Sequence, residues 1–381
     1  METEKLYYAD PYQTTFTATV LGCEAGKGGY LVTLDRTAFY PEGGGQPADH
    51  GTLGGAAVTD VHEKDGVIAH TCDRPLTVGD TVEGAIDWDR RFDHMQQHSG
   101  EHILSGLICA AHHCDNVGFH LGADTVTIDF NAALTEEDVQ ELEAAANRYI
   151  WQDHPIAISF PSPAELEALD YRSKKELTGQ VRIVSFPGAD CCACCGTHVA
   201  SSGQVGLLKI LSCQKFRQGV RLEILSGRRA LTYLSQTWDQ NRQVGQRLSA
   251  KATETAAAVE RLEAELAATK DRCAALERTV FAAKAEEYRD KGDVTLLESP
   301  MGSDAVRRLA DTVAGTCGGR CWVFAGEGEH WNYAMVDHRS GDVKELVGAV
   351  NAALRGRGGG KKGFAQGSVQ ATRQEIEDYF A

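Results

Sequence analysis

The sequence predicts an α+β protein built from four successive parts, and three observations support this prediction. Short β-branched segments separated by glycine-containing turns fill residues 1–88. Helical and strand-like patterns alternate through residues 89–227 and again through residues 291–381. Between them, in residues 228–290, apolar residues recur every seven positions. We therefore expect a small β-barrel, an α+β domain, a helical coiled-coil segment and a C-terminal α/β domain, in that order.

The first part is predicted to be all-β. Residues 14–20 alternate in the manner of a half-buried strand, and residues 30–34 form a second apolar run after a glycine-rich turn. Further strands are expected at residues 57–61, 66–70 and 81–86. Short strands with close turns are typical of small barrels and sandwiches.

A run of three glycines, Gly43-Gly44-Gly45, precedes Gln46 within this part. Glycine adopts backbone conformations that are closed to other residues, so the run permits a close approach between the backbone and a partner. Composition alone favours a flexible loop. Both interpretations stay open at this point.

Two short motifs supply possible metal ligands. A helix is expected over residues 87–111, and it would carry His98 and His102 on one face, one turn apart. Cys194 and His198 have the same spacing within a cysteine-rich turn expected over residues 190–198. Either motif alone is weak evidence for a metal. Together they form a His/His/Cys/His set, which suits Zn²⁺ better than Mg²⁺ or Ca²⁺.

The remaining elements of the second part are expected from periodicity. Thr135 is the predicted N-cap of a helix that runs to residue 151, with Asp138 at its third position. The other expected elements are strands at 125–130, 156–160, 181–186, 205–212 and 219–225, and a helix at 164–169.

The third part carries an imperfect heptad pattern of about five repeats. It predicts either a helical hairpin within one chain or a seam between two chains, and we favour a homodimer contact. The two apolar positions are occupied by Leu248, Thr255, Leu262, Thr269, Leu276 and Ala283, and by Ala252, Val259, Leu266, Cys273 and Val280.

The last part is expected to contain strands at 294–297, 321–324 and 331–337 and helices at 303–315 and 343–354. It also contains a glycine-rich, basic segment at residues 355–368. Backbone N–H groups beside lysine and arginine would make a phosphate-binding loop. A basic linker is the alternative, and we favour the loop because structured sequence follows it.

The amino-acid composition argues against some classes of function and location and favours others. The formal net charge of −16 argues against non-specific binding of nucleic acid by the whole surface, although a local basic path for a structured RNA is compatible with it. Five of the 12 cysteines crowd between Cys191 and Cys213, which indicates a reduced protein with a metal or thiol site. No apolar run approaches the ~20 residues of a membrane span, and no signal peptide is apparent. We expect a cytoplasmic protein.

Four blocks of the sequence, in order, resemble a known family. They are residues 39–46 with the glycine run, 98–102 with both histidines, 194–198 with the cysteine, and 358–366 near the C-terminus. The chain resembles the free-standing alanyl-tRNA editing proteins of the long AlaX type, and the editing and C-terminal DHHA1-type domains of alanyl-tRNA synthetase. No segment resembles the class II aminoacylation core. The resemblance therefore implies editing without charging.

By resemblance, the chain is a trans-editing hydrolase that removes serine or glycine from mischarged tRNA(Ala). The implied metal is one Zn²⁺ per chain, with His98, His102, Cys194 and His198 as its ligands. Cys192 and Cys195 compete for the thiolate role, and Cys191 is a weaker candidate.

Three residues are candidates for catalysis or substrate reading. Glu101 lies between the two helical histidines and is a candidate general base, although an exposed helix carboxylate is an equal alternative. Thr197 and His120 are candidates for recognising the hydroxyl of serine.

For tRNA and substrate binding, the candidates are the motif from Gly43 to Gln46 and a set of basic residues. Surface arginines are usually only solvated, so each one is an individual hypothesis. The basic candidates are Arg217, Arg221, Arg228, Arg229, Arg355, Arg357, Lys361 and Lys362.

Three other functions compete with this one. The zinc could be structural, in a non-catalytic tRNA-binding module. The segment 98–102 also fits the HxxEH pattern of a metallopeptidase, but that interpretation leaves the other three blocks unexplained. A phosphoesterase role is disfavoured because the chain has no acidic DHH cluster.

Overall fold

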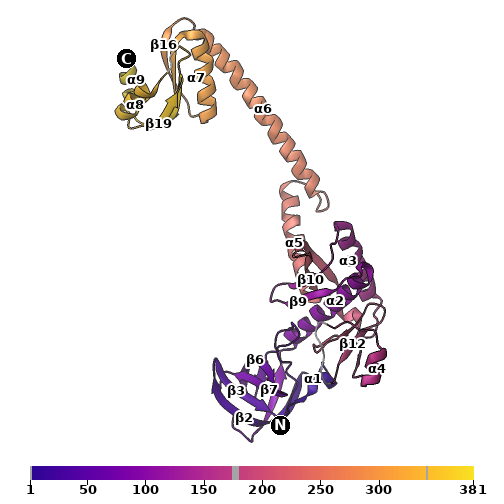
Figure 1. Ribbon diagram of the computed structural model, residues 1–381. Coiled ribbons are helices and arrows are strands. Elements are labelled where there is room, and N and C mark those ends of the chain that lie inside the picture. The colour runs from indigo at the N-terminus through magenta and orange to yellow at the C-terminus, as the bar shows by residue number, and fades with distance from the viewer. Residues whose placement is uncertain (1, 174–179, 340–341) are drawn as a thin grey trace. The chain divides into compact units, whose positions relative to one another are not determined.

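The computed structural model describes residues 2–173, 180–339 and 342–381, and the chain divides into two compact units at residues 1–241 and 242–381 (Figure 1). The predicted α+β class is confirmed, because both units contain helices packed on sheets. The finer division into four parts stays a prediction. Within the described ranges, no helix combines the length and the apolar character that crossing a bilayer requires.

The N-terminal part of unit 1 is a closed barrel whose six strands follow the order β2-β3-β7-β6-β5-β8. Alternating side chains point into its core, as in β2, where Phe16, Ala18 and Val20 are buried. The barrel strands are β2 (Thr15–Gly26), β3 (Gly29–Leu34), β5 (Gly51–Leu53), β6 (Ala56–Lys64), β7 (Val67–Cys72) and β8 (Thr81–Ile86). A short helix, α1 (Leu6–Ala9), and the strand pair β1 (Glu4–Lys5) and β4 (Arg36–Thr37) complete this part.

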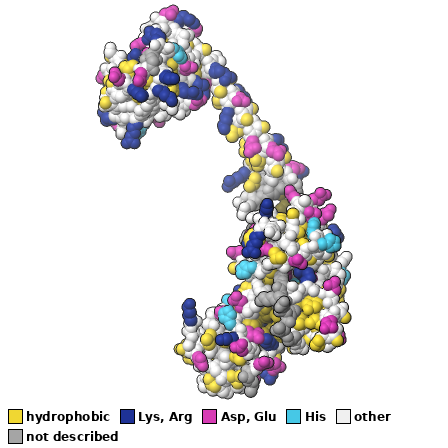
Figure 2. Space-filling model, viewed as in Figure 1, with side chains coloured by type: hydrophobic (Ala, Val, Ile, Leu, Met, Phe, Trp, Pro, Cys, Tyr) yellow, Lys and Arg dark blue, Asp and Glu magenta, His cyan; other side chains and the backbone are white. Residues whose placement is uncertain are grey.

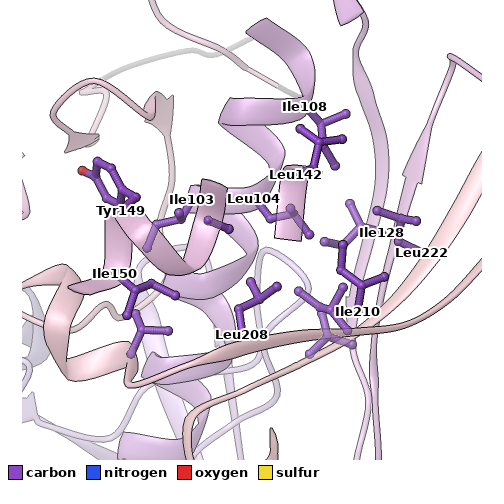
Figure 3. Packing of buried hydrophobic residues seen from close by; sticks show 14 of the residues in the cluster. Ile103, Leu104, Ile108, Ile128, Leu142, Tyr149, Ile150, Leu208, Ile210 and Leu222 are labelled. Carbon is purple, nitrogen blue, oxygen red and sulfur yellow. The ribbon is translucent and has the colours of Figure 1, made fainter. Parts of the chain in front are cut away.

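Helix α2 (Trp88–His112) follows the barrel and packs on a four-stranded antiparallel sheet of order β14-β15-β10-β9. The side chain of Asp87 caps its N-terminus by accepting a hydrogen bond from the Arg90 N–H. Apolar side chains of α2 meet those of the sheet and of α3 (Glu136–Trp151) in a fully buried core (Figure 3). The sheet strands are β9 (Asn116–Leu121), β10 (Val126–Phe130), β14 (Leu208–Phe216) and β15 (Gly219–Ser226).

A second, three-stranded sheet carries the cysteine-rich segment. Its strands are β11 (Ala157–Ser159), β12 (Ile183–Phe186) and β13 (Asp190–Ala193), and α4 (Pro163–Ala168) and a 3₁₀ turn (Ser202–Val205) lie nearby in the chain. Residues 190–193 were expected to belong to a turn, and this was wrong: they pair with β12, and the turn begins at Cys194. Thr135 caps α3 with Asp138 in the predicted capping box.

The heptad segment forms two helices with a break between them. They are α5 (Gly227–Arg247) and α6 (Thr255–Glu287), and Leu248 and Ala252 lie in the break between them. The break removes both residues from the predicted stripe, which therefore runs only along α6.

Unit 2 continues from α6 into a five-stranded sheet of order β16-β17-β18-β20-β19. Helix α7 (Ser303–Cys317) covers one face with α6, and α8 (Lys344–Ala353) and α9 (Arg373–Phe380) cover the other. The strands are β16 (Gly292–Glu298), β17 (Gly318–Glu327), β18 (His330–Val336), β19 (Arg357–Lys361) and β20 (Phe364–Gln370). The glycine-rich segment was predicted to be a loop, but it is the hairpin β19–β20, with Lys362 and Gly363 at positive φ in its turn.

One buried ion pair joins the barrel to α2. Arg91 on α2 and Asp49 in the segment between β4 and β5 are both fully buried. The Arg91 guanidinium donates to the Asp49 carboxylate, with Nε 3.0 Å from Oδ2, and also to the carbonyls of Pro11 and Ala38 at 2.8 and 2.6 Å. The first helical turns of α2 are thereby fixed against the barrel.

Replacing Arg91 should destabilise this junction severely. Arg91→Met leaves the Asp49 carboxylate buried without a counter-charge, which costs about 3–5 kcal/mol. The expected result is a lower urea midpoint for the first unfolding transition of the full chain. Arg74→Met, at an exposed arginine of the barrel, is the control and should change stability by less than about 0.5 kcal/mol. Equal midpoints for the two variants would contradict this role of Arg91.

Candidate metal centre

Four side chains predicted as metal ligands meet in the structure. His98 and His102 leave the same face of α2, with ring centroids 5.2 Å apart, and the turn after β13 brings Cys194 and His198 to them. One donor atom from each of the four lies within 4.8 Å of every other. The three histidines are almost completely buried. This is the arrangement that a tetrahedral ion requires.

The Nδ1 atom of each histidine has its own polar neighbour, and Nε2 is left facing the cluster. His98 Nδ1 lies 2.9 Å from Gln46 Oε1, and His102 Nδ1 lies 2.8 Å from Asp190 Oδ2. His198 Nδ1 lies 3.4 Å from Ser99 Oγ, and its buried Nε2 has no hydrogen-bond partner among the described residues. Metal-ligating histidines typically donate a hydrogen bond from the ring nitrogen that does not bind the metal. The residues present therefore fit a bound zinc ion.

The electrostatics of the cluster favour the ligating forms of Cys194 and His198. Burial would raise the pKa of Cys194, but the three surrounding histidines outweigh it and hold the pKa well below the usual value, which favours the thiolate. Burial lowers the pKa of His198 to about 3, so this ring is neutral. Burial would also lower the pKa of His102, but the charges of Cys194 and Glu101 and the Asp190 hydrogen bond raise it instead. The same negative groups would favour a bound cation.

Geometry separates the competing cysteines. Cys194 is the cysteine that shares the four-donor group with the histidines. The Cys192 thiol lies on the other side of His102, grouped with Asp190. Cys195 is exposed, and the Cys191 sulfur contacts Ser185 Oγ at 3.5 Å. These positions favour Cys194 as the thiolate ligand.

Gln46 has a structural position that the sequence did not predict. Its fully buried amide accepts from the backbone N–H of Thr197 at 3.2 Å and donates to the Thr197 hydroxyl at 2.8 Å, while Oε1 also faces His98. Gln46 therefore links the barrel to both halves of the metal centre. We expected it to bind substrate or tRNA directly, and its burial instead favours a role in orienting His98 and Thr197.

The glycines around His98 are required by close approach. Gly43 pairs with Gln46 in a tight turn, and Gly44 and Gly45 both have positive φ. A Cβ atom on Gly45 would lie 2.6 Å from the Phe119 ring, which stacks on His98 with centroids 5.0 Å apart. Phe119 was not identified from the sequence. The run of glycines is therefore an ordered turn.

Gly196 lies on another side of the same imidazole. A Cβ atom there would lie 2.2 Å from His98 Cε1, so no side chain fits. Arg182 Nη1 donates to the carbonyls of Cys194 and Gly196 at 2.7 and 3.0 Å and fixes the turn that carries the thiol. Neither Arg182 nor Asp190 was predicted to belong to the site.

Glu101 is buried beside the donor cluster, so the alternative of an exposed helix carboxylate is excluded. Its Oε1 accepts hydrogen bonds from Ser105 Oγ at 2.8 Å and Asn116 Nδ2 at 2.6 Å. Its Oε2 lies 3.9 Å from His102 Nε2, the nitrogen that faces the cluster. The carboxylate is therefore held in one orientation next to the place where a reacting group would bind.

Thr197 is brought to the site and His120 is not. Thr197 is buried between the cluster and Gln46. His120 is exposed on β9, and its neighbour Phe119 contacts His98 instead. Adjacent residues of a strand face opposite sides, so His120 lies on the opposite side of β9 from Phe119.

The predicted basic contacts of unit 1 differ in how they are engaged. Arg217 is exposed in the turn between β14 and β15. Arg221 pairs with Asp129 through two hydrogen bonds of 2.7 and 2.8 Å. Arg228 pairs with Asp89, and Arg229 pairs with Asp93.

In unit 2, Arg357, Lys361 and Lys362 are exposed on the β19–β20 hairpin, while Arg355 pairs with Glu375 at 2.9 Å. Basic side chains are numerous on the face of this unit that Figure 2 shows. The basic candidates of the two units are thus separate groups, each within its own unit.

Three family models match the chain. Residues 4–90 match a model described as class II (A) tRNA synthetases, residues 181–222 match the second additional domain of threonyl- and alanyl-tRNA synthetases, and residues 294–380 match the DHHA1 domain. The expectation was that no segment resembles the class II aminoacylation core, yet the first model, described as class II synthetases, matches residues 4–90. The residues that it covers form the barrel and its flanking elements.

Curated relatives match across most of the chain. An alanyl-tRNA editing protein Aarsd1 of Danio rerio is 28% identical over 92% of this chain and 87% of its own length. The alanyl-tRNA editing protein AlaX-L of Pyrococcus horikoshii is 29% identical over 98% of this chain and 96% of its own length. An alanine–tRNA ligase of Archaeoglobus fulgidus is 32% identical over 99% of this chain, which spans only 43% of that protein. These matches confirm the resemblance that the sequence motifs predicted.

Adjacent cysteines provide a matched test of the metal centre. Cys194→Ser should lower the zinc affinity of the purified protein by at least about 10-fold, because the thiolate of the donor group is lost. Cys195→Ser, at the exposed neighbour, should retain one zinc ion per chain. Zinc content is measured by mass spectrometry after dialysis against a weak chelator. Equal zinc retention by both variants would exclude Cys194 as a ligand.

Proposed function

We propose that this chain, which resembles the alanyl-tRNA editing proteins over most of its length, hydrolyses the ester between tRNA(Ala) and a wrong amino acid, serine or glycine. The observation that carries the proposal is the buried group of His98, His102, Cys194 and His198 with Glu101 beside it. An aminoacyl ester is already activated, so a positioned base and a polarising group suffice for its hydrolysis. The protein would act in the cytoplasm.

Zinc is the ion that this donor set suits, with one ion per chain. When bound, it would polarise the ester carbonyl or hold the amino group of the substrate. The chain itself holds the ligands in place through Gln46 and Asp190, which fix the rings of His98 and His102.

Glu101 is the proposed general base. Ser105 and Asn116 hold one carboxylate oxygen, so the other remains directed toward the cluster side of His102. That oxygen would take a proton from the attacking water and return it to the leaving ribose oxygen. The fixed orientation limits the carboxylate to one productive position.

Thr197 is the residue proposed to recognise the serine hydroxyl through a hydrogen bond. Gln46 donates to its Oγ1, so the Thr197 O–H remains available to donate to a substrate hydroxyl. With alanine bound, this O–H would lack a partner in a buried site, which disfavours hydrolysis of the correct product.

The exposed basic residues are the proposed contacts to the tRNA body. They are Arg217 in unit 1 and Arg357, Lys361 and Lys362 in unit 2. Because these contacts would neutralise phosphates, tRNA affinity should fall as salt rises.

The apolar stripe of α6 is the proposed contact for a second copy of the chain. Val259, Leu262, Leu266, Leu276 and Val280 are 40–63% exposed, and apolar side chains alternate with charged ones along this helix in Figure 2. Helix α7 packs against a different face, through Phe281 and Ala285. In a parallel pair of helices, Glu265 would face Lys270 of the second copy, which is the charge pattern of a two-stranded coiled coil.

The decisive experiment is release of serine, glycine and alanine from separately charged tRNA(Ala), with and without a zinc chelator. The proposal predicts rapid loss of serine or glycine, slow loss of alanine, and inhibition by the chelator. No release from any of the three, with zinc and tRNA still bound, would leave a non-catalytic tRNA-binding module.

Glu101→Gln should lower kcat for release of the mischarged amino acid by about 10²–10⁴-fold, since the base is lost while the hydrogen bonds to Ser105 and Asn116 survive. Glu141→Gln, at an exposed position of α3, is the matched control and should be unchanged. Zinc content should be the same in both variants. Normal turnover by Glu101→Gln would remove Glu101 from the mechanism.

Thr197→Val should reduce the preference for serine over alanine by about 10-fold or more in kcat/KM, because the hydroxyl that pairs with serine is gone. The measurement is the ratio of the two deacylation rates at equal enzyme concentration. An unchanged ratio would assign the discrimination to another residue.

Leu266→Glu should convert a dimer to a monomer, because it places a charge in the apolar seam. Ala268→Glu, at an exposed position off the stripe, should leave the dimer intact. Light scattering after size-exclusion chromatography gives the mass of each. A wild-type chain that is monomeric at micromolar concentration would refute the dimer.

A further inference from the structure

Arg172 comes from the segment after α4 and lies along the free edge of the three-stranded sheet. Its N–H donates to the Cys191 carbonyl at 2.8 Å, and its carbonyl accepts from the Ala193 N–H at 2.9 Å. Arg172 thereby forms a parallel bridge to Cys192, beside the last strand of the order β11-β12-β13. These hydrogen bonds involve only the backbone, so a substitution at residue 172 can leave the bridge in place.

The Arg172 guanidinium forms a two-point ion pair with Asp190. Its Nε lies 2.7 Å from Oδ1, and its Nη2 lies 2.7 Å from Oδ2. The Asp190 side chain is 2% exposed, whereas the Arg172 side chain is 26% exposed. A bidentate pair of this kind fixes the plane of the carboxylate and the directions of its lone pairs. The guanidinium therefore determines the orientation of the buried carboxylate.

The Asp190 carboxylate transmits this orientation to a predicted metal ligand. Oδ2, the oxygen that accepts from Arg172 Nη2, also lies 2.8 Å from His102 Nδ1. Phe186, the register partner of Asp190 on β12, stacks on the same imidazole with centroids 5.2 Å apart. Asp190 thus holds the edge of the ring and Phe186 holds its face. The Nε2 atom of His102 is left for the donor cluster.

A second donor group competes for His102. One atom each of His102, Asp190 and Cys192 lies within 4.8 Å of the others, and all three residues are buried. A metal ion bound by Asp190 would lie beside the positively charged Arg172 guanidinium, and this repulsion disfavours the three-donor group. The ion pair therefore keeps Asp190 as a hydrogen-bond acceptor for His102 and favours the four-donor group with Cys194.

We propose that Arg172 is a positioning residue of the metal centre, which acts through Asp190 to hold the His102 imidazole in the orientation that binds the metal. The inference rests on the proposed function, because it requires zinc at the four-donor group. It does not depend on which ester the protein hydrolyses. Second partners of this kind typically affect metal affinity, although they bind no metal themselves.

The test is the zinc affinity of the purified full chain, measured by competition with a chromophoric chelator. Arg172→Met retains a long side chain and removes the guanidinium, and it should weaken zinc binding about 10-fold. Arg221→Met is the matched control, because Arg221 forms the same two-point pair with Asp129, at 2.7 and 2.8 Å. The control should bind zinc as the wild type does. Wild-type affinity of Arg172→Met, or an equal loss in both variants, would overturn the proposal.

A double-variant cycle tests whether the effect passes through Asp190. Asp190→Ala should weaken zinc binding about 10–100-fold, since His102 Nδ1 loses its acceptor. The double variant with Arg172→Met should bind zinc no more weakly than Asp190→Ala alone, because the guanidinium then has no carboxylate to orient. Losses that multiply would overturn the proposal, since Arg172 would then act by another route.

Arg172→Lys covers the case in which Arg172→Met does not fold. Lysine retains the positive charge but offers Asp190 a single point in place of two parallel hydrogen bonds. The variant should melt at the wild-type temperature and still weaken zinc binding about 3-fold or more. Unchanged affinity would overturn the proposal, because charge without orientation would then suffice.

Chemical rescue provides a response that a merely structural arginine would not show. Arg172 lines a hollow of about 470 Å³, so small ions can reach the place of its side chain. Millimolar guanidinium ion should raise the zinc affinity of Arg172→Ala by replacing the missing group. It should not raise the affinity of Asp190→Ala, which lacks the carboxylate to be oriented. An equal gain in both variants would overturn the proposal.

Deacylation at controlled free zinc separates this proposal from the proposed function. Arg172→Met should lose activity at limiting zinc and regain nearly the wild-type kcat at saturating zinc, whereas Glu101→Gln should not recover. Normal deacylation by the wild type, with unchanged zinc affinity of Arg172→Met, would refute the positioning role and keep the function. Weakened zinc binding by Arg172→Met, with a wild type that binds zinc but deacylates no charged tRNA, would refute the function and keep the positioning role.

Discussion

The buried ion pair between Arg91 and Asp49 is the constraint on which the metal centre depends. Asp49 also accepts a hydrogen bond from the Tyr40 N–H at 2.6 Å, so it fixes both ends of the segment that contains Gln46. Arg91 lies two helical turns before His98 on α2. The single hydrogen bond between Gln46 and His98 therefore joins two elements that the ion pair has already brought into register. Breaking the pair leaves a buried charge uncompensated, so the barrel and α2 are held together strongly.

Much of the fold could be predicted because its signals are local. The apolar period of α2 and the capping box of α3 each involve residues that are close together in the sequence. Both helices were predicted to within one residue of each end. Strands that lack such signals were missed. β19 is mostly glycine and is a strand because β20 pairs with it, and β13 pairs with β12 despite its cysteines. In these cases tertiary pairing outweighs weak local propensity.

In the candidate site, too, the features with local sequence signals could be predicted and those that depend on tertiary contacts could not. The four donors were found from the sequence because each pair is separated by one helical turn or one tight turn. Gln46 was singled out from the sequence for a different role, and Asp190 was not singled out. Their contacts with His98 and His102 could not be predicted, because they lie 52 and 88 positions from the histidines they contact. Phe119 was missed and His120 chosen, because a strand places neighbours on opposite faces and the sequence did not show which face is inner. Glu101 was recognised as a candidate, but its burial and its two hydrogen-bond donors follow only from the fold.

The close packing of backbone around His98 has a consequence for ion selection. Gly196, the Phe119 ring and Gln46 all lie against the imidazole, and Gly45 lies against Phe119. The chain, and not the ion, therefore determines where this nitrogen points. A pocket organised in advance does not fold around its ion, so selection among divalent ions rests on the softness of the thiolate and imidazoles and on their fixed spacing. Cobalt(II), which accepts the same tetrahedral donors, should enter without remodelling and make the centre visible by its absorption spectrum.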